Sequence, residues 1–278
     1  MGAVIKTYGV SDPGPETSYR NLGSDALKQC LDKGGIAALD VLISSGLYPD
    51  MHIHEPAFAS LIQGELSQSH AAQLSTTFSF DLHNGGGGSL MALRILNGFL
   101  CSGKIKTGAI VAGDALPAGS PAGALLLEKG KTEDGFQAFI QETYSQYSND
   151  YFSYTEHTGK ELKGFINQDE TYLEHLLSCV QKSVKKFLSK LKVSLDAFDL
   201  IVSCQSPDGF VSGLADLYGG KRLIQLEENH KCYSAGLILA LALAESRGSL
   251  QASKRILFIN AGPGIMIELA SYLNPERT

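Results

Sequence analysis

Four consecutive glycines, Gly85 to Gly88, join a stretch with strand character to an apolar helix. The preceding residues, Ser75 to Phe80, are β-rich, and the residues from Leu90 to about Cys101 have the period of an amphipathic helix. Several enzyme families present a nucleophile where a strand turns sharply into a buried helix, close to the helix N-terminus. Here the turn has its glycines, but no nucleophilic side chain stands at its tip.

The glycine run does not have the spacing of a nucleotide-binding loop. It contains neither GxGxxG nor a Walker pattern, and no Lys-Ser/Thr pair follows it. Two interpretations stay open. The free backbone amides before the helix could bind an anion, or the missing side chains could permit a close backbone approach from a partner.

Composition indicates a globular chain. The 278 residues are 44% hydrophobic and 19% charged, enough for one large domain or two fused halves. A net charge of -6 with both signs interspersed argues against a nucleic-acid surface. The N-terminus lacks the apolar region of a signal peptide, and the apolar run from Ala235 to Ala244 is too short to span a bilayer. We expect a cytoplasmic protein that binds neither membranes nor nucleic acid.

The cysteines and histidines predict no metal and no cofactor. The five cysteines are widely spaced, no CxxC occurs, and the seven histidines form no metal-ligand spacing. Reduced thiols fit this pattern better than a disulfide framework. The cysteines are Cys30, Cys101, Cys179, Cys204 and Cys232.

Strand and helix patterns alternate along the chain, and their order occurs twice. In the first half we expect helices at 21–32, 55–64 and 90–101, and strands at 38–45, 76–82, 106–114 and 122–128. In the second half we expect helices at 171–191, 211–218 and 233–246, and strands at 198–204, 223–226, 255–260 and 265–269. This duplication predicts two α/β halves with largely internal sheets.

The predicted halves are residues 1–129 and 130–278, fused into one domain. The second half includes a polar and aromatic segment, 130–168, which has no clear period. We expect this segment to form an insertion or a crossover.

The duplicated order resembles the thiolase fold, an α/β fold of two pseudo-repeated halves in αβαβα layers, and the local sequence resembles ketoacyl-ACP synthase III. In that family the nucleophile segment reads roughly Asp-x-x-x-x-Cys-Ala-Gly-Phe, followed by a helix, then Ser-Gly-x-x-Lys and a Val-Val-Gly-x-Asp strand. This chain has Asp81 before Gly86-Gly87-Gly88-Ser89, then Ser102-Gly103-Lys104-Ile105-Lys106, and then Ile110-Val111-Ala112-Gly113-Asp114. The resemblance extends from about Asn21 to Leu273.

By this resemblance the family's catalytic triad is missing. The nucleophilic cysteine falls on Gly86, and the His-Gln-Ala-Asn motif falls on Cys204-Gln205-Ser206-Pro207. The family's asparagine falls on Lys231 or Cys232, depending on a one-residue gap. Decarboxylative condensation needs a thiolate to carry the acyl group, as well as two donors for the enolate. We therefore expect the chemistry to be absent.

The resemblance also implies an altered oxyanion turn. The family's three glycines become Gly262-Pro263-Gly264, and Pro263 removes one backbone donor. Gly86, Gly262 and Gly264 are the expected oxyanion-like positions. The segment from Ala115 to Pro121 is shorter than the one that helps line the family's acyl tunnel, which predicts a reduced tunnel beside Gly86.

Cys204 and His83 are the candidates for displaced chemistry. Cys204 occupies the position of the family's histidine, although a small buried thiol at a strand end is the commoner role of such a cysteine. His83 precedes Gly86 by three residues and could act as a base, or it could be an ordinary strand-end or interface histidine.

Thiolase-like proteins are generally dimers that pair the strand before the nucleophile across a two-fold axis, in one ten-stranded sheet. The strand here contains no Pro or Lys to blunt its edge, so we expect it to be covered. The expected interface residues are Thr76, Thr77, Phe78, Ser79, Phe80, Asp81 and Leu82.

The resemblance implies a degenerate subunit that pairs with a catalytically active ketosynthase homologue and reaches acyl carrier protein through it. Such a subunit would serve fatty-acid, polyketide or other secondary-metabolite biosynthesis. One alternative is an acyl-CoA or acyl-ACP acyltransferase or thioesterase that uses Cys204 or His83. A second alternative is a homodimeric binding scaffold.

Overall fold

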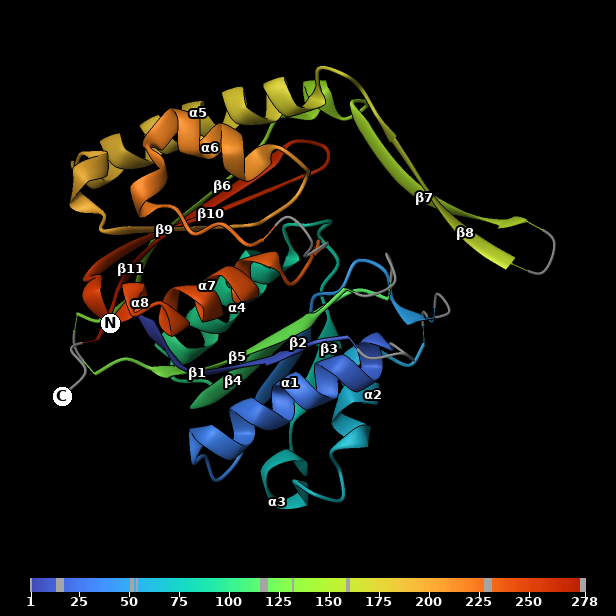
Figure 1. Ribbon diagram of the computed structural model, residues 1–278. Helices are drawn as coiled ribbons and strands as arrows, with labels where there is room; N and C mark the ends of the chain where they lie inside the picture. The colour runs from blue at the N-terminus through green and yellow to red at the C-terminus, as the bar shows by residue number, and fades with distance from the viewer. Residues whose placement is uncertain are drawn as a thin grey trace.

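The computed structural model describes residues 2–13, 18–50, 53, 55–115, 120–131, 133–158, 161–227 and 232–275. Two β-sheets and three sets of helices alternate in five layers (Figure 1). The helices α5 (Tyr172–Leu191) and α6 (Phe210–Tyr218) cover the outer face of one sheet. Helices α1 (Tyr19–Gly34) and α2 (Phe58–Glu65) cover the outer face of the other, and α4 (Gly88–Cys101) and α7 (Gly236–Ser246) lie between the sheets.

The first sheet has the strand order β1-β5-β4-β2-β3. β2 is parallel to β3 and β4, whereas β5 is antiparallel to β1 and β4. The elements of this half are β1 (Ala3–Ser11), α1 (Tyr19–Gly34), β2 (Val41–Ser44), α2 (Phe58–Glu65), α3 (Ala71–Leu74), β3 (Phe78–Asp81), α4 (Gly88–Cys101), β4 (Thr107–Ala112) and β5 (Ala122–Lys129).

The second sheet has the order β6-β11-β10-β9, with β9 parallel to β10. Its elements are β6 (Gly135–Thr143), α5 (Tyr172–Leu191), β9 (Leu200–Ser203), α6 (Phe210–Tyr218), α7 (Gly236–Ser246), α8 (Ser249–Ala252), β10 (Arg255–Gly262) and β11 (Met266–Leu273). Three short 3-10 turns accompany them, η2 (Ser145–Tyr147), η3 (Leu195–Ala197) and η4 (Gly220–Arg222). The order β6-β11-β10-β9 corresponds to the order β1-β5-β4-β2 of the first sheet. The predicted pair of repeated α/β halves is therefore confirmed.

The predicted strand at 223–226 is wrong. The second sheet has only an isolated parallel bridge between Ile201 and Leu223 where the first sheet has β3. The amide of Leu226 donates to the side-chain carbonyl of Gln205 at 3.0 Å, so a side chain replaces the strand partner. The local pattern of residues 223–226 does not reveal that the side chain of Gln205 takes the place of a neighbouring strand.

For the segment 130–168 we expected an insertion or a crossover and assigned no strands. It contains β6, an edge strand of the second sheet, and a long hairpin of β7 (Tyr151–Thr158) and β8 (Glu161–Gln168). The pairing of β6 with β11 shifts register between Ser271 and Tyr272, so that Phe136 and Phe139 both pack against the core between the sheets. This bulge interrupts the period of two that identifies a strand.

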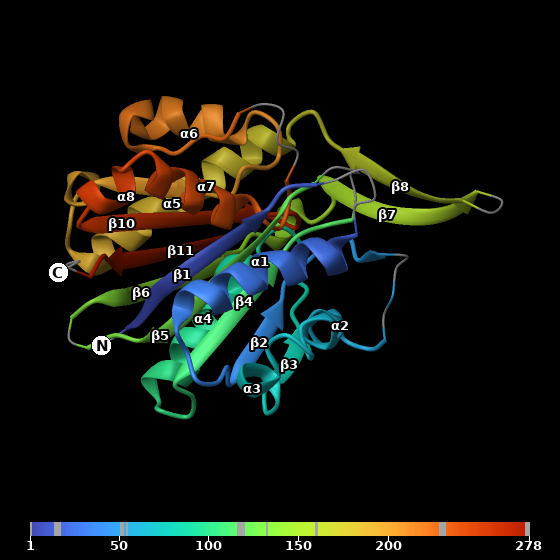
Figure 2. The same ribbon diagram turned by 60° about the horizontal axis from the view of Figure 1, so that its bottom comes forward.

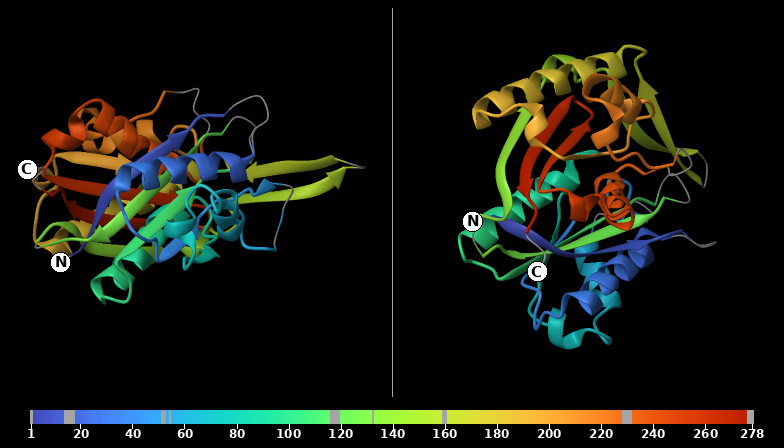
Figure 3. Two further views of the ribbon diagram at one scale, coloured as in Figure 1. Left: turned by 90° about the horizontal axis from the view of Figure 1, so that it is seen from below. Right: turned by 60° about the vertical axis from the view of Figure 1, so that its left-hand side comes forward.

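The hairpin β7–β8 projects from the body of the protein (Figures 2 and 3). Its root is held where the ring of Tyr151 packs on Tyr172, with centroids 5.2 Å apart. Beyond the root it carries exposed apolar side chains, namely Phe152, Tyr154, Phe165 and Ile166.

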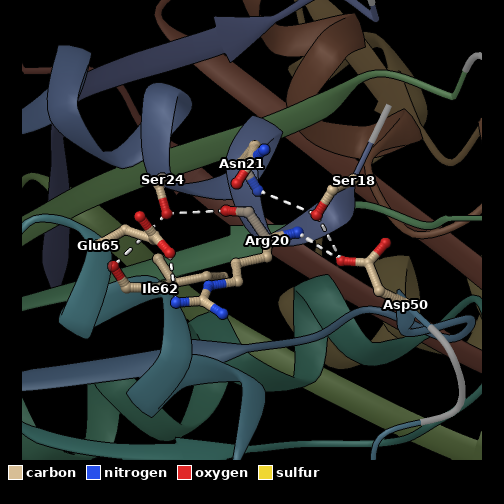
Figure 4. Close-up of polar contacts among 7 residues, drawn as sticks. All are labelled: Ser18, Arg20, Asn21, Ser24, Asp50, Ile62 and Glu65. Carbon is tan, nitrogen blue, oxygen red and sulfur yellow. Dashed lines mark hydrogen bonds and ion pairs between the residues drawn. The ribbon is translucent and has the colours of Figure 1, made fainter. Parts of the chain in front are cut away.

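Helix α1 starts at a polar network that was not predicted (Figure 4). The Asp50 carboxylate accepts hydrogen bonds from the backbone amides of Tyr19 and Arg20 and from the Ser18 hydroxyl, and Ser18 caps the helix. Arg20 forms an ion pair with Glu65 on α2. The helix expected at 21–32 runs from Tyr19 to Gly34, and Gly35 after it has a φ of 57°, which favours glycine.

The apolar core between the sheets is built largely from α4 and α7. Leu93 and Leu96 of α4 are buried, and so are residues 237 to 241 of α7, the apolar run noted in the sequence. None of the helices in the described ranges combines the length and the apolar character that crossing a bilayer requires.

Candidate functional site

The glycine turn, residues 84 to 88, connects β3 to α4. The amide of Gly87 donates to the carbonyl of Asn84 at 2.9 Å, and Gly85 has a φ of 51°. Gly88 begins α4, two residues earlier than predicted, and a Cβ there would lie 3.1 Å from Cβ of Ser45. Close packing therefore favours glycine at 88, where the helix enters the core.

Gly86 is different, because packing does not require a glycine there. The heavy atom nearest to a Cβ at this position would be the carbonyl oxygen of Ala261, at 3.9 Å, which is ordinary van der Waals distance. Gly86 does not have a positive φ, so its backbone conformation does not require glycine either. The backbone at Gly86 would therefore accept a side chain.

The second turn, Gly262 to Gly264, lies against the glycine turn. A Cβ at Gly262 would stand 3.4 Å from the amide nitrogen of Gly87 and 3.6 Å from that of Gly86. Gly264 has a φ of 76°, and Pro263 between the two glycines has no N–H. The structure thus brings Gly86 and Gly262 together, with one backbone donor fewer than three glycines would supply.

Cys204 belongs to the apolar core of the second half. Its side chain is buried, and its sulfur accepts a hydrogen bond from the amide of Ala261 at 3.3 Å. Burial raises the pKa of Cys204 to about 12. A thiol with this pKa is almost wholly protonated at neutral pH, and the thiolate is the nucleophilic form.

Cys232 is also buried, and burial raises its pKa to about 12. It lines a cavity of about 690 Å³ between the root of the hairpin and the loop that follows β9. Gly86 is not among the residues that line this cavity. Lys231, the other candidate for the asparagine position, lies outside the described residues.

His83 is exposed at the end of β3. Its Nδ1 lies 3.1 Å from the carbonyl oxygen of Gly46, to which it donates, and this bond ties the glycine turn to the loop after β2. Within the described residues His83 and Cys204 share no hydrogen bond. The structure does not assemble them into a nucleophile–base pair.

Two buried carboxyl groups beside the site were not predicted. Asp114 follows β4, and its two oxygens accept from the amides of Leu47, Tyr48 and Ser234 and from the Ser234 hydroxyl, at 2.8 to 3.0 Å. The one feature of the sequence that could have indicated this role is the position of Asp114 at the end of a buried strand. Burial raises its pKa, against the opposing effect of these donors.

Glu268 of β11 lies beneath the glycine turn. Asn84 donates to its Oε1 at 3.4 Å, and a Cβ at Gly87 would stand 3.7 Å from its Oε2. Burial raises the pKa of Glu268 to about 7. Its neighbours in the sequence, Ile267 and Leu269, are apolar, so the sequence did not indicate that Glu268 contacts the glycine turn.

The predicted interface strand is shorter than expected, because β3 covers only residues 78 to 81. Thr77 precedes it, with a hydroxyl that donates to the carbonyl of Leu39 at 2.7 Å. Asp81 instead caps α2, since its carboxylate accepts from the amides of Phe58 and Ala59, and this explains why α2 begins at 58 rather than 55. Phe78 is 63% exposed on the outermost strand of its sheet.

Within the described ranges no group of three or more His, Cys, Asp or Glu residues is arranged to hold a metal ion. The expectation that the protein uses no cofactor stays a prediction.

No family model matches the chain. In sequence it is similar to "Beta-ketoacyl-[acyl-carrier-protein] synthase III" of Rickettsia massiliae, with 23% identity over 273 residues that cover 90% of this chain and 83% of the relative. Among solved structures it is similar to 3-oxoacyl-(acyl carrier protein) synthase III, FabH, of Pseudomonas aeruginosa, with a TM-score of 0.85, 16% identity and full coverage of both chains. It is also similar to OleA of Xanthomonas campestris, with a TM-score of 0.78, 15% identity and 98% coverage of each chain.

Proposed function

Since this chain is a ketoacyl-ACP synthase III-like member of the thiolase superfamily, we propose that it is a catalytically inactive subunit of a condensing enzyme, paired with an active ketosynthase homologue. The observation that carries the proposal is Gly86. It stands at the tip of the turn between β3 and α4, where the backbone has room for a side chain, yet it offers no atom that could carry an acyl group.

The remaining groups near the turn support inactivity. Burial raises the pKa of Cys204 to about 12, so the protonated thiol predominates at pH 7. Pro263 cannot donate to an oxyanion. The alternative of a transferase or thioesterase that uses Cys204 or His83 has less support, because the thiol is buried and the histidine bonds to a backbone carbonyl.

The edge of β3 supports a partner of the same fold. β3 is the outermost strand of the first sheet, and exposed Phe78 lies against Phe80 with ring centroids 5.4 Å apart. An uncovered strand edge with exposed aromatic rings favours pairing with another chain. An active homologue paired there would supply the nucleophile and bind acyl carrier protein, and this chain would shape the acyl pocket in fatty-acid, polyketide or secondary-metabolite biosynthesis.

The test combines intact-protein mass spectrometry with native mass spectrometry. The purified protein is incubated with a panel of acyl-CoAs, with a Cys204→Ala variant as the matched control. The complex isolated from the source organism is weighed in parallel. We expect no acyl adduct on this chain and a one-to-one complex with a cysteine-bearing ketosynthase.

Two results would contradict the proposal. An acyl adduct that disappears in the Cys204→Ala variant would make the protein an acyltransferase with displaced chemistry. A homodimer without an adduct and without a copurifying ketosynthase would favour a binding scaffold.

A further inference from the structure

The second sheet carries a buried polar pair on the face that covers α4. Asn260 and Glu268 are register partners on β10 and β11 and are only 1% and 4% exposed. The next pair on the same face, Phe258 and Ala270, belongs to the apolar core between the sheets. A carboxyl group is thus inserted into an otherwise apolar layer.

This carboxyl group lies against the N-terminus of α4. Its Oε2 stands 3.7 Å from the position of a Cβ at Gly87, which is the N-cap residue of the helix. The backbone amide of Met91, in the first turn, interacts favourably with the carboxylate. A helix N-terminus carries a positive potential that stabilises one nearby anion.

Few hydrogen bonds hold this anion in place. Within the described residues Oε2 of Glu268 and both polar atoms of the Asn260 amide lack a partner at full hydrogen-bond geometry. Asn260 is nevertheless the polar neighbour that most favours the ionised carboxyl group. The charged group that faces Glu268 from α4 is Arg94, whose Nη1 donates to Gln141 on β6 at 3.0 Å. Burial disfavours the ionised carboxyl group and raises its pKa, while Asn260, Arg94 and the Met91 amide favour the ionised form.

We propose that Glu268, in its ionised form, takes up the positive potential at the N-terminus of α4, and that it is a second determinant, besides Gly86, of the missing acyl-transfer chemistry. The inference rests on the proposed function for its biological meaning. The electrostatic effect of Glu268 does not depend on that function, because a thiolate or oxyanion formed at Gly86 would be repelled by a negative carboxylate beneath the same turn. Restoring the nucleophile alone would then give a poorly ionised thiol.

The test places a thiol at the turn and measures its ionisation. Gly86→Cys has the room it needs, since the nearest atom to its Cβ is 3.9 Å away. Three proteins are compared: Gly86→Cys, Gly86→Cys with Glu268→Gln, and Gly86→Cys with Glu142→Gln. Glu142 of β6 stands opposite Ile267, one row from Glu268, and forms an ion pair with Lys186 on α5. Glu142→Gln removes one carboxyl group, as Glu268→Gln does, but at a different position. Alkylation by iodoacetamide is followed against pH at the peptide containing position 86.

We expect the introduced thiol to titrate about one pH unit lower when Glu268→Gln is present, so that it reacts about tenfold faster below both midpoints. The Glu142→Gln protein should behave like the single variant. Equal midpoints with and without Glu268→Gln would overturn the inference. Where Glu268→Gln impairs folding, Glu268→Met, an apolar side chain of similar length, gives the same comparison. None of these results depends on the natural partner, so they stand apart from the test of the proposed function.

Discussion

The Asp114 carboxylate accepts hydrogen bonds from both the backbone amide and the hydroxyl of Ser234, at 2.9 and 3.0 Å. Asp114 follows β4 of the first half, and Ser234 lies just before α7 of the second. The same carboxylate also accepts from the amides of Leu47 and Tyr48. One buried side chain therefore joins three segments at the end of the molecule that carries the glycine turn.

Replacing this carboxylate should destabilise the protein strongly. Asp114→Ala would remove the acceptor of four hydrogen bonds, and of their donors the Leu47 amide has a second acceptor in the Ser234 hydroxyl. We expect a loss of about 3 to 5 kcal/mol in the free energy of unfolding. Urea denaturation followed by circular dichroism measures the change. Asp196→Asn, at a carboxyl group that is 83% exposed, is the control and should change stability by less than about 0.5 kcal/mol. A loss of similar size in both variants would contradict the assigned role.

The order of the elements could be predicted from the sequence, because period and turn residues encode it locally. The helix expected at 21–32 is found at 19–34, and the duplicated order is confirmed, for this reason. The β6 strand was missed because its bulge breaks the period of two. The strand at 223–226 was predicted wrongly because Gln205, distant in sequence, supplies the bond that a strand would have made.

The site was predictable only in part. The two glycine turns could be located from the sequence, and the structure places Gly86 and Gly262 side by side. Asp114 and Glu268 escaped prediction as polar partners, because their roles depend on donors from other elements and on burial. A carboxyl group in an apolar strand shows no period or motif that distinguishes it from an exposed residue.

Glu268 should make stability depend on pH. Its pKa is raised from 4.5 to about 7 by burial, so the folded protein binds the proton more tightly than the unfolded chain does. The stability that this provides is fully present below about pH 4.5 and is lost as the pH rises through about 7. The loss is about 3 kcal/mol, at 1.36 kcal/mol per unit. Denaturation of the protein and of Glu268→Gln from pH 4.5 to 8.5 measures it, and the variant should lack this fall.

Other carboxyl groups contribute to the pH profile, so the comparison is between variants. Glu142→Gln is the control, since the pKa of Glu142 is lowered, with Lys186 and Ser183 outweighing burial. Its contribution has the opposite sign and is lost as the pH falls. Parallel profiles of the protein and Glu268→Gln would show that Glu268 titrates normally.

The edge of β3 should form the subunit interface. Phe78→Glu places a charge on the exposed outer strand and should separate the proposed heterodimer, leaving this chain as a folded monomer, because burying an unpaired charge is costly. Sedimentation velocity measures the mass, and circular dichroism checks the fold. Leu217→Glu, at a residue of α6 that is 38% exposed, is the control and should leave the dimer intact. A Phe78→Glu protein that remains dimeric would place the interface elsewhere.

The start of α1 should depend on Asp50. Asp50→Ala removes the acceptor for the amides of Tyr19 and Arg20 and for the Ser18 hydroxyl (Figure 4), and we expect a loss of about 1 to 2 kcal/mol. Chemical denaturation measures it, and faster hydrogen exchange at the first turn of α1 should accompany it. Asp25→Ala, on the exposed face of the same helix, should be neutral or slightly stabilising. Unchanged exchange at residues 19 to 22 in Asp50→Ala would show that Ser18 alone suffices as the cap.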